Sequence, residues 1–288
     1  MARVTLSPQD VRVSKPNLLD RSGAAVIDLL RYLFYLLALF YLSIKVVWTN
    51  RHLGQRDFIR QVLLQIYYTG VQAGGPVIAL ALAVGAFAIV EGVGGIGSLS
   101  GAESLGKMVT VVVLREIAPL LTGGVVIVRS VTAIASELGV MRVQREIEAL
   151  EVMGISPIRQ LVTPRIFGGL LSLFGLNILF NGVALIGGFL IARMLVSIPA
   201  ELFFRAVVSA VSPLDVVAFS LKILVGGIGV FLIACYHGMA VERSSTEVPV
   251  AVSRASLNSL VFLVVLHVGI SVAVVLSSDV SPLIGGML

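Results

Sequence analysis

Charge is scarce in this chain of 288 residues. Asp, Glu, Lys and Arg make up 13% of it, whereas soluble domains carry about 25%. Hydrophobic residues reach 57%, and the mean hydropathy is +1.02. This composition excludes an ordinary soluble domain and indicates a polytopic membrane protein. The apolar runs are continuous and do not alternate with polar residues, which favours spanning helices over barrel strands.

Cysteine and histidine are also rare. The single cysteine, Cys235, excludes an intrachain disulfide and a cysteine-based zinc site, and we expect it to be a small buried hydrophobe. The three histidines, His52, His237 and His267, are scattered without the spacing of metal ligands. We therefore predict no metal or cofactor in this chain.

Basic residues outnumber acidic ones, which raises the question of nucleic-acid binding. The net charge is +5, and the isoelectric point is near 9.7. The basic residues cluster at the ends of apolar runs, as the positive-inside rule requires. Membrane topology accounts for them, so we do not expect a nucleic-acid partner.

Five long apolar runs predict five membrane-spanning helices, each able to cross about 30 Å of hydrocarbon. They cover residues 62–90, 107–135, 166–192, 216–240 and 255–276. The loops after the second and fourth runs carry arginines, which places them in the cytoplasm and the C-terminus outside. Residues 91–106 and 193–215 then form outer loops.

Residues 1–60 differ from the rest. The first 22 residues are polar, and we see no cleavable signal peptide. Ile27–Val47 is apolar and aromatic, but basic residues flank it on both sides, so the Lys and Arg asymmetry of a true span is missing. We predict an interfacial or re-entrant helix with both ends in the cytoplasm; a sixth full span is the alternative.

Two glycine-rich stretches spell nucleotide-binding motifs. Gly92–Gly97 fits G-x-G-x-x-G, but the preceding apolar run is too long for the strand that a dinucleotide site needs. Gly101–Lys107 resembles a P-loop, but Met108 stands where a Ser or Thr should bind Mg²⁺. Glycine-rich turns explain both stretches. We therefore expect that this chain has no ATPase site of its own.

The second run contains Arg115, Glu116, Pro119 and Arg129. Ionisable residues inside a membrane are costly and usually face a bundle interior or a water-filled cavity. Arg115 and Arg129 are close to four helical turns apart, which predicts a common face. We name these four residues as substrate-cavity candidates; an internal ion pair that locks the helices is the alternative. His267 in the fifth run is either a proton relay or a hydrogen-bonded interhelical contact.

The most charged segment, 136–164, lies between two apolar runs. Over about 138–153 it predicts a short amphipathic helix at the cytoplasmic surface, with an apolar stripe of Val143, Ile147 and Leu150. Gly154 and then Pro157 supply the stop signal. We interpret this as a coupling helix that docks on an ATPase; a solvated connector is the alternative. Its coupling residues are Glu137, Arg142, Arg145, Glu146, Glu148, Glu151 and Gly154.

The same segment carries two resemblances. Glu148-Ala149-Leu150-x-x-x-Gly154 is similar to the E-A-A-x-x-x-G loop of ABC importer permeases, although the downstream part is shorter. More extensively, the chain resembles the MlaE (YrbE) permease family from about Val62 to its end. The matching strings are Arg115-Glu116-Ile-Ala-Pro119-Leu, Arg129, Ala135-Ser-Glu137-Leu-Gly139-Val-Met141-Arg142, Glu146-Ile-Glu148-Ala149-Leu150-Glu151-Val-Met153-Gly154-Ile155-Ser-Pro157-Ile158 and Leu161-Val-x-Pro164-Arg165. Ser156 departs from the family's G-I-D-P.

The resemblance implies a permease domain over 61–288, five spans preceded by an interfacial helix, and two copies per complex. It also implies an ATPase dimer that binds ATP and Mg²⁺, a periplasmic ring of Mce-domain subunits and, in some members, a STAS-domain subunit. The lipid cavity would lie at the dimer interface, where the Gly- and Ala-rich first span, kinked at Pro76, could pack closely.

From the residues and the resemblance together we predict a multi-pass permease of the bacterial inner membrane, not an enzyme. It would move phospholipid or a related lipid between that membrane and the Mce-domain partner. An ABC permease for a small solute and a proton-coupled transporter that uses Glu116 and His267 are the alternatives.

Overall fold

The structure is a computed structural model that describes residues 18–49, 55–96, 109–196, 199–242 and 244–285. All regular structure in these residues is helical. In chain order, with η marking π-helical segments, the elements are α1 (Leu18–Thr49), α2 (Gln55–Ile66), η1 (Tyr67–Val71), α3 (Gly74–Ile96), η2 (Val109–Ile117), α5 (Ala118–Val126), η3 (Ile127–Val131), α6 (Thr132–Val143), α7 (Glu146–Val152), η4 (Ile158–Val162), α8 (Thr163–Val196), α9 (Ala200–Ala210), α10 (Pro213–Met239) and α11 (Glu247–Gly285).

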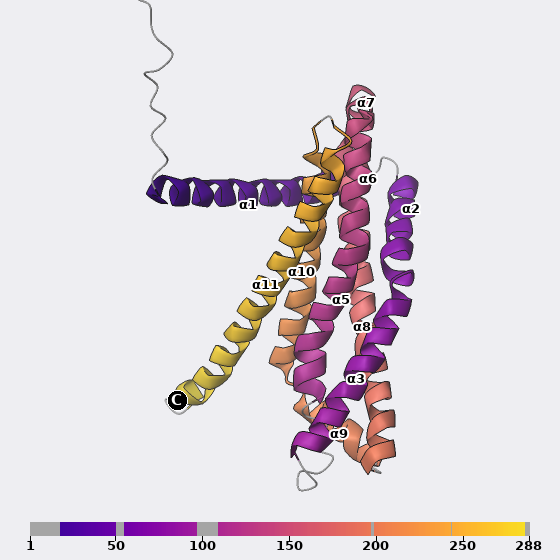
Figure 1. Cartoon of the computed structure of the whole chain (residues 1–288), viewed down its shortest axis with the longest axis vertical. Coiled ribbons are helices and arrows are strands. Elements are labelled where there is room, and N and C mark those ends of the chain that lie inside the picture. Colours follow the sequence, from indigo (N-terminus) through magenta and orange to yellow (C-terminus); the bar gives the residue numbers. More distant parts are fainter. Residues whose placement is uncertain (1–17, 50–54, 97–108, 197–198, 243, 286–288) are drawn as a thin grey trace, which may run out of the picture.

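Five continuous helical stretches are long and apolar enough to cross a membrane. They are Gln55–Gly92, Thr110–Val143, Ile158–Leu195, Pro213–Met239 and Glu247–Ser277. The predicted fold class, an all-helical membrane protein with five spans, is therefore confirmed. The spans form a bundle with α7 at one end and α9 at the other (Figure 1), and we call these the α7 end and the α9 end.

Each observed span is longer than the apolar run that predicted it. The third begins at Ile158 and the fifth at Glu247, well before the predicted starts at residues 166 and 255. Hydropathy marks the part of a helix in hydrocarbon, whereas the helix itself continues into the charged interface, where long basic side chains reach water. The predicted loop over 241–254 is shorter for the same reason.

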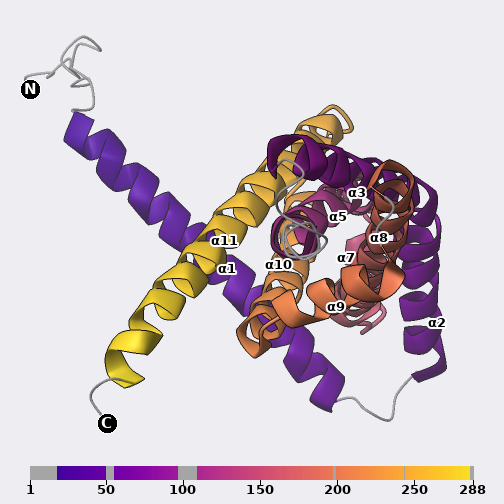
Figure 2. The same cartoon turned by 90° about the horizontal axis from the view of Figure 1, so that it is seen from below.

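Helix α1 lies across the bundle, close to perpendicular to the spans and at the α7 end (Figure 1). Seen along the bundle, α1 and α11 both extend past the other helices (Figure 2). Tyr32 of α1 packs edge-on against Tyr236 at the end of α10, with ring centroids 5.0 Å apart. This orientation agrees with the predicted interfacial helix, and α1 is not among the five helices of the described residues that are long and apolar enough to cross a membrane. Its place at the membrane surface stays a prediction. The polar tail before Leu18 lies outside the described residues.

The outer loop predicted over 193–215 contains a helix, α9. Phe203, Ala206 and Val207 are buried, and the i, i+3, i+4 spacing puts them on one face. Phe203 packs against Phe189 of α8, with centroids 5.6 Å apart. The segment is short and begins at Ala200, directly after Pro199, with Glu201 in its first turn, so hydropathy alone does not separate it from a loop.

Two of the π-helical segments, η2 and η3, lie in the second span on either side of α5. A π-helical turn closes its hydrogen bond one residue later than an α-helical turn and so changes the face that later residues present. Arg115 lies in η2 and Arg129 in η3. The prediction that the two arginines share a face requires an uninterrupted α-helix between them. The π-helical segments interrupt it, so the 3.6-residue spacing does not hold from Arg115 to Arg129.

Small residues bring α3 and α8 into close contact. A Cβ atom on Gly85 would lie 2.4 Å from the backbone oxygen of Ala184, and one on Gly188 would lie 3.3 Å from the backbone oxygen of Gly85. Part of the small-residue surface of the first span is therefore used within the chain. Gly75 differs, because a Cβ there meets no described atom within 4 Å. A dimer interface at this span stays a prediction. Only small residues that do not already pack within the chain, such as Gly75, are available for it.

Replacement of Gly85 by Ala should destabilise the protein by about 1–3 kcal/mol, because the neighbouring backbone cannot give way. Gly75→Ala in the same helix is the matched control; it should change stability by no more than about 1 kcal/mol and in the stabilising direction. Stepwise heating of the detergent-solubilised protein, followed by size-exclusion chromatography, measures both midpoints. Equal midpoints for the two variants would contradict the packing described here.

Candidate functional site

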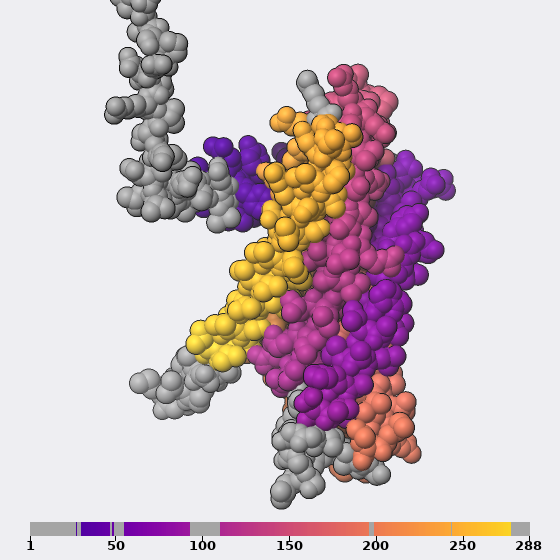
Figure 3. Space-filling view, in the orientation of Figure 1, coloured from indigo at the N-terminus to yellow at the C-terminus, as the bar shows by residue number. Residues whose placement is uncertain are grey.

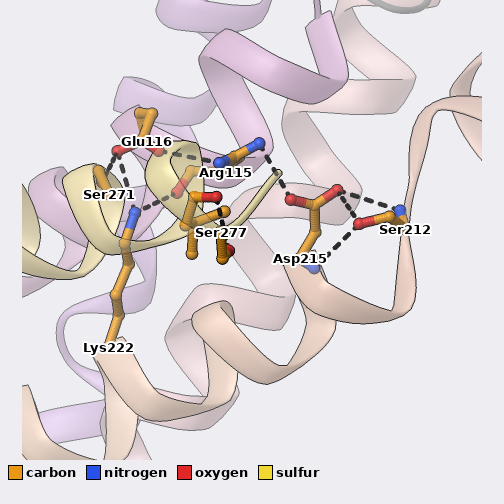
Figure 4. A network of polar contacts seen from close by, with 8 residues as sticks. Arg115, Glu116, Ser212, Asp215, Lys222, Ser271 and Ser277 are labelled. Carbon is orange, nitrogen blue, oxygen red and sulfur yellow. Dashed lines mark hydrogen bonds and ion pairs between the residues drawn. The ribbon is translucent and has the colours of Figure 1, made fainter. Parts of the chain in front are cut away.

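Charged side chains from the second and fourth spans meet one another and a serine of the fifth span (Figure 4). Lys222 Nζ lies 2.9 Å from Glu116 Oε2, and Arg115 Nη1 lies 3.1 Å from Asp215 Oδ1. Arg115 Nε is 3.4 Å from Glu116 Oε1. Ser271 Oγ of α11 donates to Glu116 Oε2 at 2.7 Å. Two cations and two anions thus balance one another, and we call these five residues the charge network.

Lys222 is the buried centre of the charge network, with its side chain 1% exposed. Its Nζ also donates to the backbone oxygen of Arg115 at 3.2 Å. In an α-helix that oxygen would accept from the N–H four residues later, but this residue is Pro119, which has no N–H. Pro119, a predicted cavity residue, is itself buried. Its contribution is to leave a carbonyl oxygen available to Lys222.

Asp215 is held in place by the start of α10. Ser212 and Asp215 form a capping box, in which Ser212 Oγ accepts from Asp215 N at 3.2 Å and Ser212 N donates to Asp215 Oδ2 at 3.0 Å. The sequence S-P-L-D fits this motif, with proline at the first helical position. The capping contacts occupy Oδ2 and leave Oδ1 for Arg115.

A cavity of about 190 Å³ lies beside the Arg115–Asp215 pair. Its walls are mainly apolar, from residues such as Leu114, Val216 and Phe219, with Arg115, Asp215 and Asn181 as polar groups. The side-chain oxygen of Asn181 is buried and has no hydrogen-bond partner among the described residues. An apolar chamber with a few polar groups at one side suits an amphiphilic molecule.

Arg129 lies apart from the charge network. It is exposed, and its Nη1 donates to the backbone oxygen of Gln72, while Nη2 lies 3.5 Å from Gln72 Oε1. The four predicted cavity residues are therefore not brought together. The contacts of Glu116 agree with the ion-pair alternative, whereas Arg115 both pairs with acids and lines the cavity. His267 is buried and donates through Nδ1 to Leu263 O at 3.2 Å within its own helix.

At the α7 end, the helix predicted over 138–153 is divided. The second span continues to Val143, and a separate helix, α7, covers Glu146–Val152. Arg145 between them has φ 60° and ψ 21°. A left-handed residue interrupts the run of right-handed helix, and the amphipathic pattern alone did not reveal this break.

The apolar stripe of α7 faces the protein. Ile147 is buried, and Val143 and Leu150 are half-buried. Arg142 Nη1 of α6 lies 3.3 Å from Glu148 Oε1 of α7, and Glu137 pairs with Arg165 at 2.9 Å. The remaining predicted coupling residues, Arg145, Glu146 and Glu151, are exposed. A cavity of about 350 Å³ is lined by Arg142, Val143, Arg145, Glu148 and Glu242.

Gly154 ends α7 as predicted. It adopts φ +74°, Ile155 N donates to Leu150 O at 2.9 Å, and Gly154 N donates to Glu151 O at 3.0 Å. This pair of bonds is the Schellman motif, which needs a left-handed residue at this position. The turn leaves Val152 and Met153 at the tip of α7 exposed, at 89% and 63%.

The model of the family described as "Permease MlaE" matches residues 62–273. The chain belongs to the MlaE permease family. It is similar to the "Intermembrane phospholipid transport system permease protein MlaE" of Haemophilus influenzae, 26% identical over 196 residues, which cover 68% of this chain and 75% of the relative. A "Probable ABC transporter permease protein" of Rickettsia prowazekii is 24% identical over 208 residues, 72% of this chain and 80% of the relative.

A third relative is "Protein TRIGALACTOSYLDIACYLGLYCEROL 1, chloroplastic" of Arabidopsis thaliana, 28% identical over 202 residues, 70% of this chain and 58% of the relative. As an MlaE-family permease, the chain is the membrane subunit of an ABC transporter and works with an ATPase subunit. It is not itself an enzyme. Family membership gives no support to the proton-coupled alternative.

Three of the five residues of the charge network, Asp215, Lys222 and Ser271, are not among the site residues that the sequence predicts. Lys222 lies in the predicted apolar run 216–240, Ser271 in the run 255–276 and Asp215 in the predicted outer loop 193–215. A lysine within an apolar run was the available signal, because such a residue needs an acidic partner inside the bundle. The glycine stretch at 92–97 begins inside α3, and the stretch at 101–107 lies outside the described residues.

Glu116→Gln removes the carboxylate that pairs with buried Lys222 and should destabilise the protein by about 3 kcal/mol. This is the lower end of the range for a broken buried ion pair, because Glu116 is partly exposed. Lys222→Met should cost less, because Glu116 keeps Arg115 and Ser271. The double variant Glu116→Gln/Lys222→Met should recover most of the loss. Thermal midpoints of the four proteins form the double-mutant cycle.

The control for this cycle is Arg205→Gln. Arg205 pairs with Glu201 at 2.9 Å, but both side chains are more than 70% exposed, so its loss should cost less than about 1 kcal/mol. Additive effects of Glu116→Gln and Lys222→Met would contradict the pairing.

Gly154→Ala should weaken the end of α7 by about 1 kcal/mol, because alanine resists the left-handed conformation. A Cβ atom there meets no described atom within 4 Å, so only the backbone conformation changes. Gly154→Asn should be milder, since asparagine tolerates this conformation. Amide hydrogen exchange in α7 measures the difference; equal protection in both variants would contradict it.

Proposed function

We propose that this chain is the permease subunit of an ATP-driven lipid transporter in the bacterial inner membrane. It moves phospholipid or a related lipid between that membrane and a periplasmic ring of Mce-domain subunits. The observation that carries the proposal is the family match over residues 62–273, together with a relative named for intermembrane phospholipid transport. The α7 end faces the cytoplasm and the α9 end the periplasm.

The cavity at the α9 end supports an amphiphilic substrate. Its walls are apolar, while Arg115, Asp215 and Asn181 supply polar contacts at one side. Because Arg115 is already paired with Asp215, a bound head group would compete for a guanidinium that the network holds in position. The name of the Arabidopsis relative also refers to a glycosylated diacylglycerol. Both features favour lipid over a small hydrophilic solute.

Coupling to the ATPase dimer, which binds ATP and Mg²⁺, would use α7. The exposed apolar tip, Val152 and Met153, suits a groove on a partner, since apolar residues this exposed often mark an interaction site. Arg142 and Glu148 join α7 to the second span. Closure of the ATPase dimer on ATP would move α7, and the second span would carry this movement to the charge network.

The assembly would contain two copies of this chain. Open small residues such as Gly75 on the first span are the available surface for a close seam. Exposed side chains of α9, with Arg205 and Glu201 among them, are available to the Mce-domain ring. A STAS-domain subunit would bind from the cytoplasm with the ATPase.

Purification of the native complex, followed by mass spectrometry of its bound molecules, tests the proposal. We expect an ATPase subunit, an Mce-domain subunit and phosphate-containing lipid in the same preparation. Transfer of fluorescent phospholipid between vesicles should depend on ATP. A preparation that holds a small hydrophilic solute and no lipid would instead establish the solute permease.

Val152→Asp should reduce co-purification of the ATPase by at least about tenfold, because a carboxylate would have to be buried in the apolar contact. Val208→Asp on α9 is the matched control, since Val208 is 74% exposed at the opposite end; it should leave ATPase binding unchanged. Charge reversal with Glu148→Lys and Glu151→Lys should uncouple ATP hydrolysis from transfer or prevent assembly. Normal assembly and transfer in Val152→Asp and in both charge-reversal variants would refute the docking role of α7.

A further inference from the structure

Arg129 lies near the middle of the second span, Thr110–Val143. It is eight residues before Glu137 and thirteen after Glu116. At 1.5 Å per residue, these acids are about 12 Å and about 20 Å away along the helix. A cation at this depth needs a counter-charge or water, because hydrocarbon stabilises neither the charge nor its N–H donors.

Gln72 holds the guanidinium in place. Its backbone oxygen is free to accept because the residue four positions later is Pro76, which has no N–H, while Val77 N donates to Ala73 O at 3.1 Å. Arg129 Nη1 donates to that oxygen, and Nη2 lies 3.5 Å from Gln72 Oε1. Both acceptors are neutral, and a guanidinium has five N–H groups. The charge and several donors therefore remain for another partner.

No described acidic side chain can supply the counter-charge. The described acids of the spans lie toward the span ends, as Asp57, Glu91, Glu116, Glu137, Asp215 and Glu247 do, and Glu242 lies between the fourth and fifth spans. A second copy has the same orientation in the membrane, so it brings its own described acids to these same depths. The anion that neutralises Arg129 therefore comes from outside these parts of the chain.

The surroundings of Arg129 match a lipid. Arg129 and Gln72 are both exposed, and next to them along their helices Tyr68, Val71 and Val128 are 57%, 65% and 71% exposed. Helix α3 lies beside the α5–α6 span on the face shown in Figure 3. A single cationic group set in an exposed apolar surface can bind a phosphate while the surface holds acyl chains.

We propose that Arg129, positioned by Gln72, binds the phosphate of a phospholipid about midway between the two leaflets. The acyl chains lie against Val71 and Val128. This rests on the proposed lipid function and deepens it, because it adds a binding position between the α7 end and the cavity at the α9 end. A lipid head group that crosses the membrane here meets a counter-charge where hydrocarbon offers none.

A photo-crosslinking residue at Val128, in the complete complex reconstituted in phosphatidylethanolamine and phosphatidylglycerol vesicles, tests this. One set of vesicles contains radiolabelled phospholipid and another contains radiolabelled diacylglycerol, which lacks the phosphate. We expect the phospholipid adduct to exceed the diacylglycerol adduct. Arg129→Gln should lower the phospholipid adduct by about tenfold, the loss expected for a charge-assisted contact, and leave the diacylglycerol adduct unchanged. Arg129→Lys should give an intermediate value.

Arg193→Gln, at an exposed arginine of α8 to which no binding role is assigned, is the control and should change neither adduct. Equal phospholipid adducts in Arg129→Gln and wild type would overturn the proposal, as would a main adduct to the second copy of the chain. If Arg129→Gln fails to assemble with the ATPase, the test is the ratio of phospholipid adduct to diacylglycerol adduct in the wild type. Equal amounts of the two adducts would refute phosphate binding. ATP-dependent phospholipid transfer by the wild type is measured in parallel; its absence contradicts the proposed function itself.

Discussion

A carbonyl oxygen inside a membrane must find a hydrogen-bond donor within the protein, and this constraint shapes the second span and its neighbours. Pro76 and Pro119 each deprive an oxygen four residues earlier of its helical donor. In both places a long cationic side chain from another span supplies the donor: Arg129 reaches the oxygen of Gln72, and Lys222 reaches that of Arg115. Each proline thus creates a site where a hydrogen bond joins two spans, and the donor at each site is a charged side chain inside the bundle.

The two sites where a cationic side chain joins neighbouring spans differ in charge balance. At the charge network two acids neutralise Arg115 and Lys222, and Ser271 adds the fifth span. At Arg129 the acceptors are neutral oxygens of Gln72. The network therefore holds three spans in a fixed arrangement, whereas the arginine retains capacity for an anion. The second span, Thr110–Val143, is one continuous helical stretch that contains Arg115, Glu116 and Arg129 and ends next to α7. A displacement of α7 can therefore be passed along this span to both sites.

The sequence was sufficient for the spans, the interfacial helix and the end of α7, because each rests on local chemistry. The length of an apolar run predicts a span, the basic residues on both sides of α1 predict its surface position, and Gly154 predicts a left-handed turn. Lys222, Asp215 and α9 were missed because their meaning depends on partners far away in the chain. The division at Arg145 was missed because a non-glycine residue in the left-handed region leaves little trace in an amphipathic pattern. The π-helical segments were missed because no composition marks them.

Those π-helical segments have one more consequence. A π-helical segment is what an α-helix forms when a residue is inserted while both ends stay in place. Loss of one residue from η3 can therefore be absorbed by a return to ordinary α-helix, whereas a deletion in α10 would rotate every later side chain. The second span therefore carries its own tolerance for the loss of a single residue, with both of its ends kept in place.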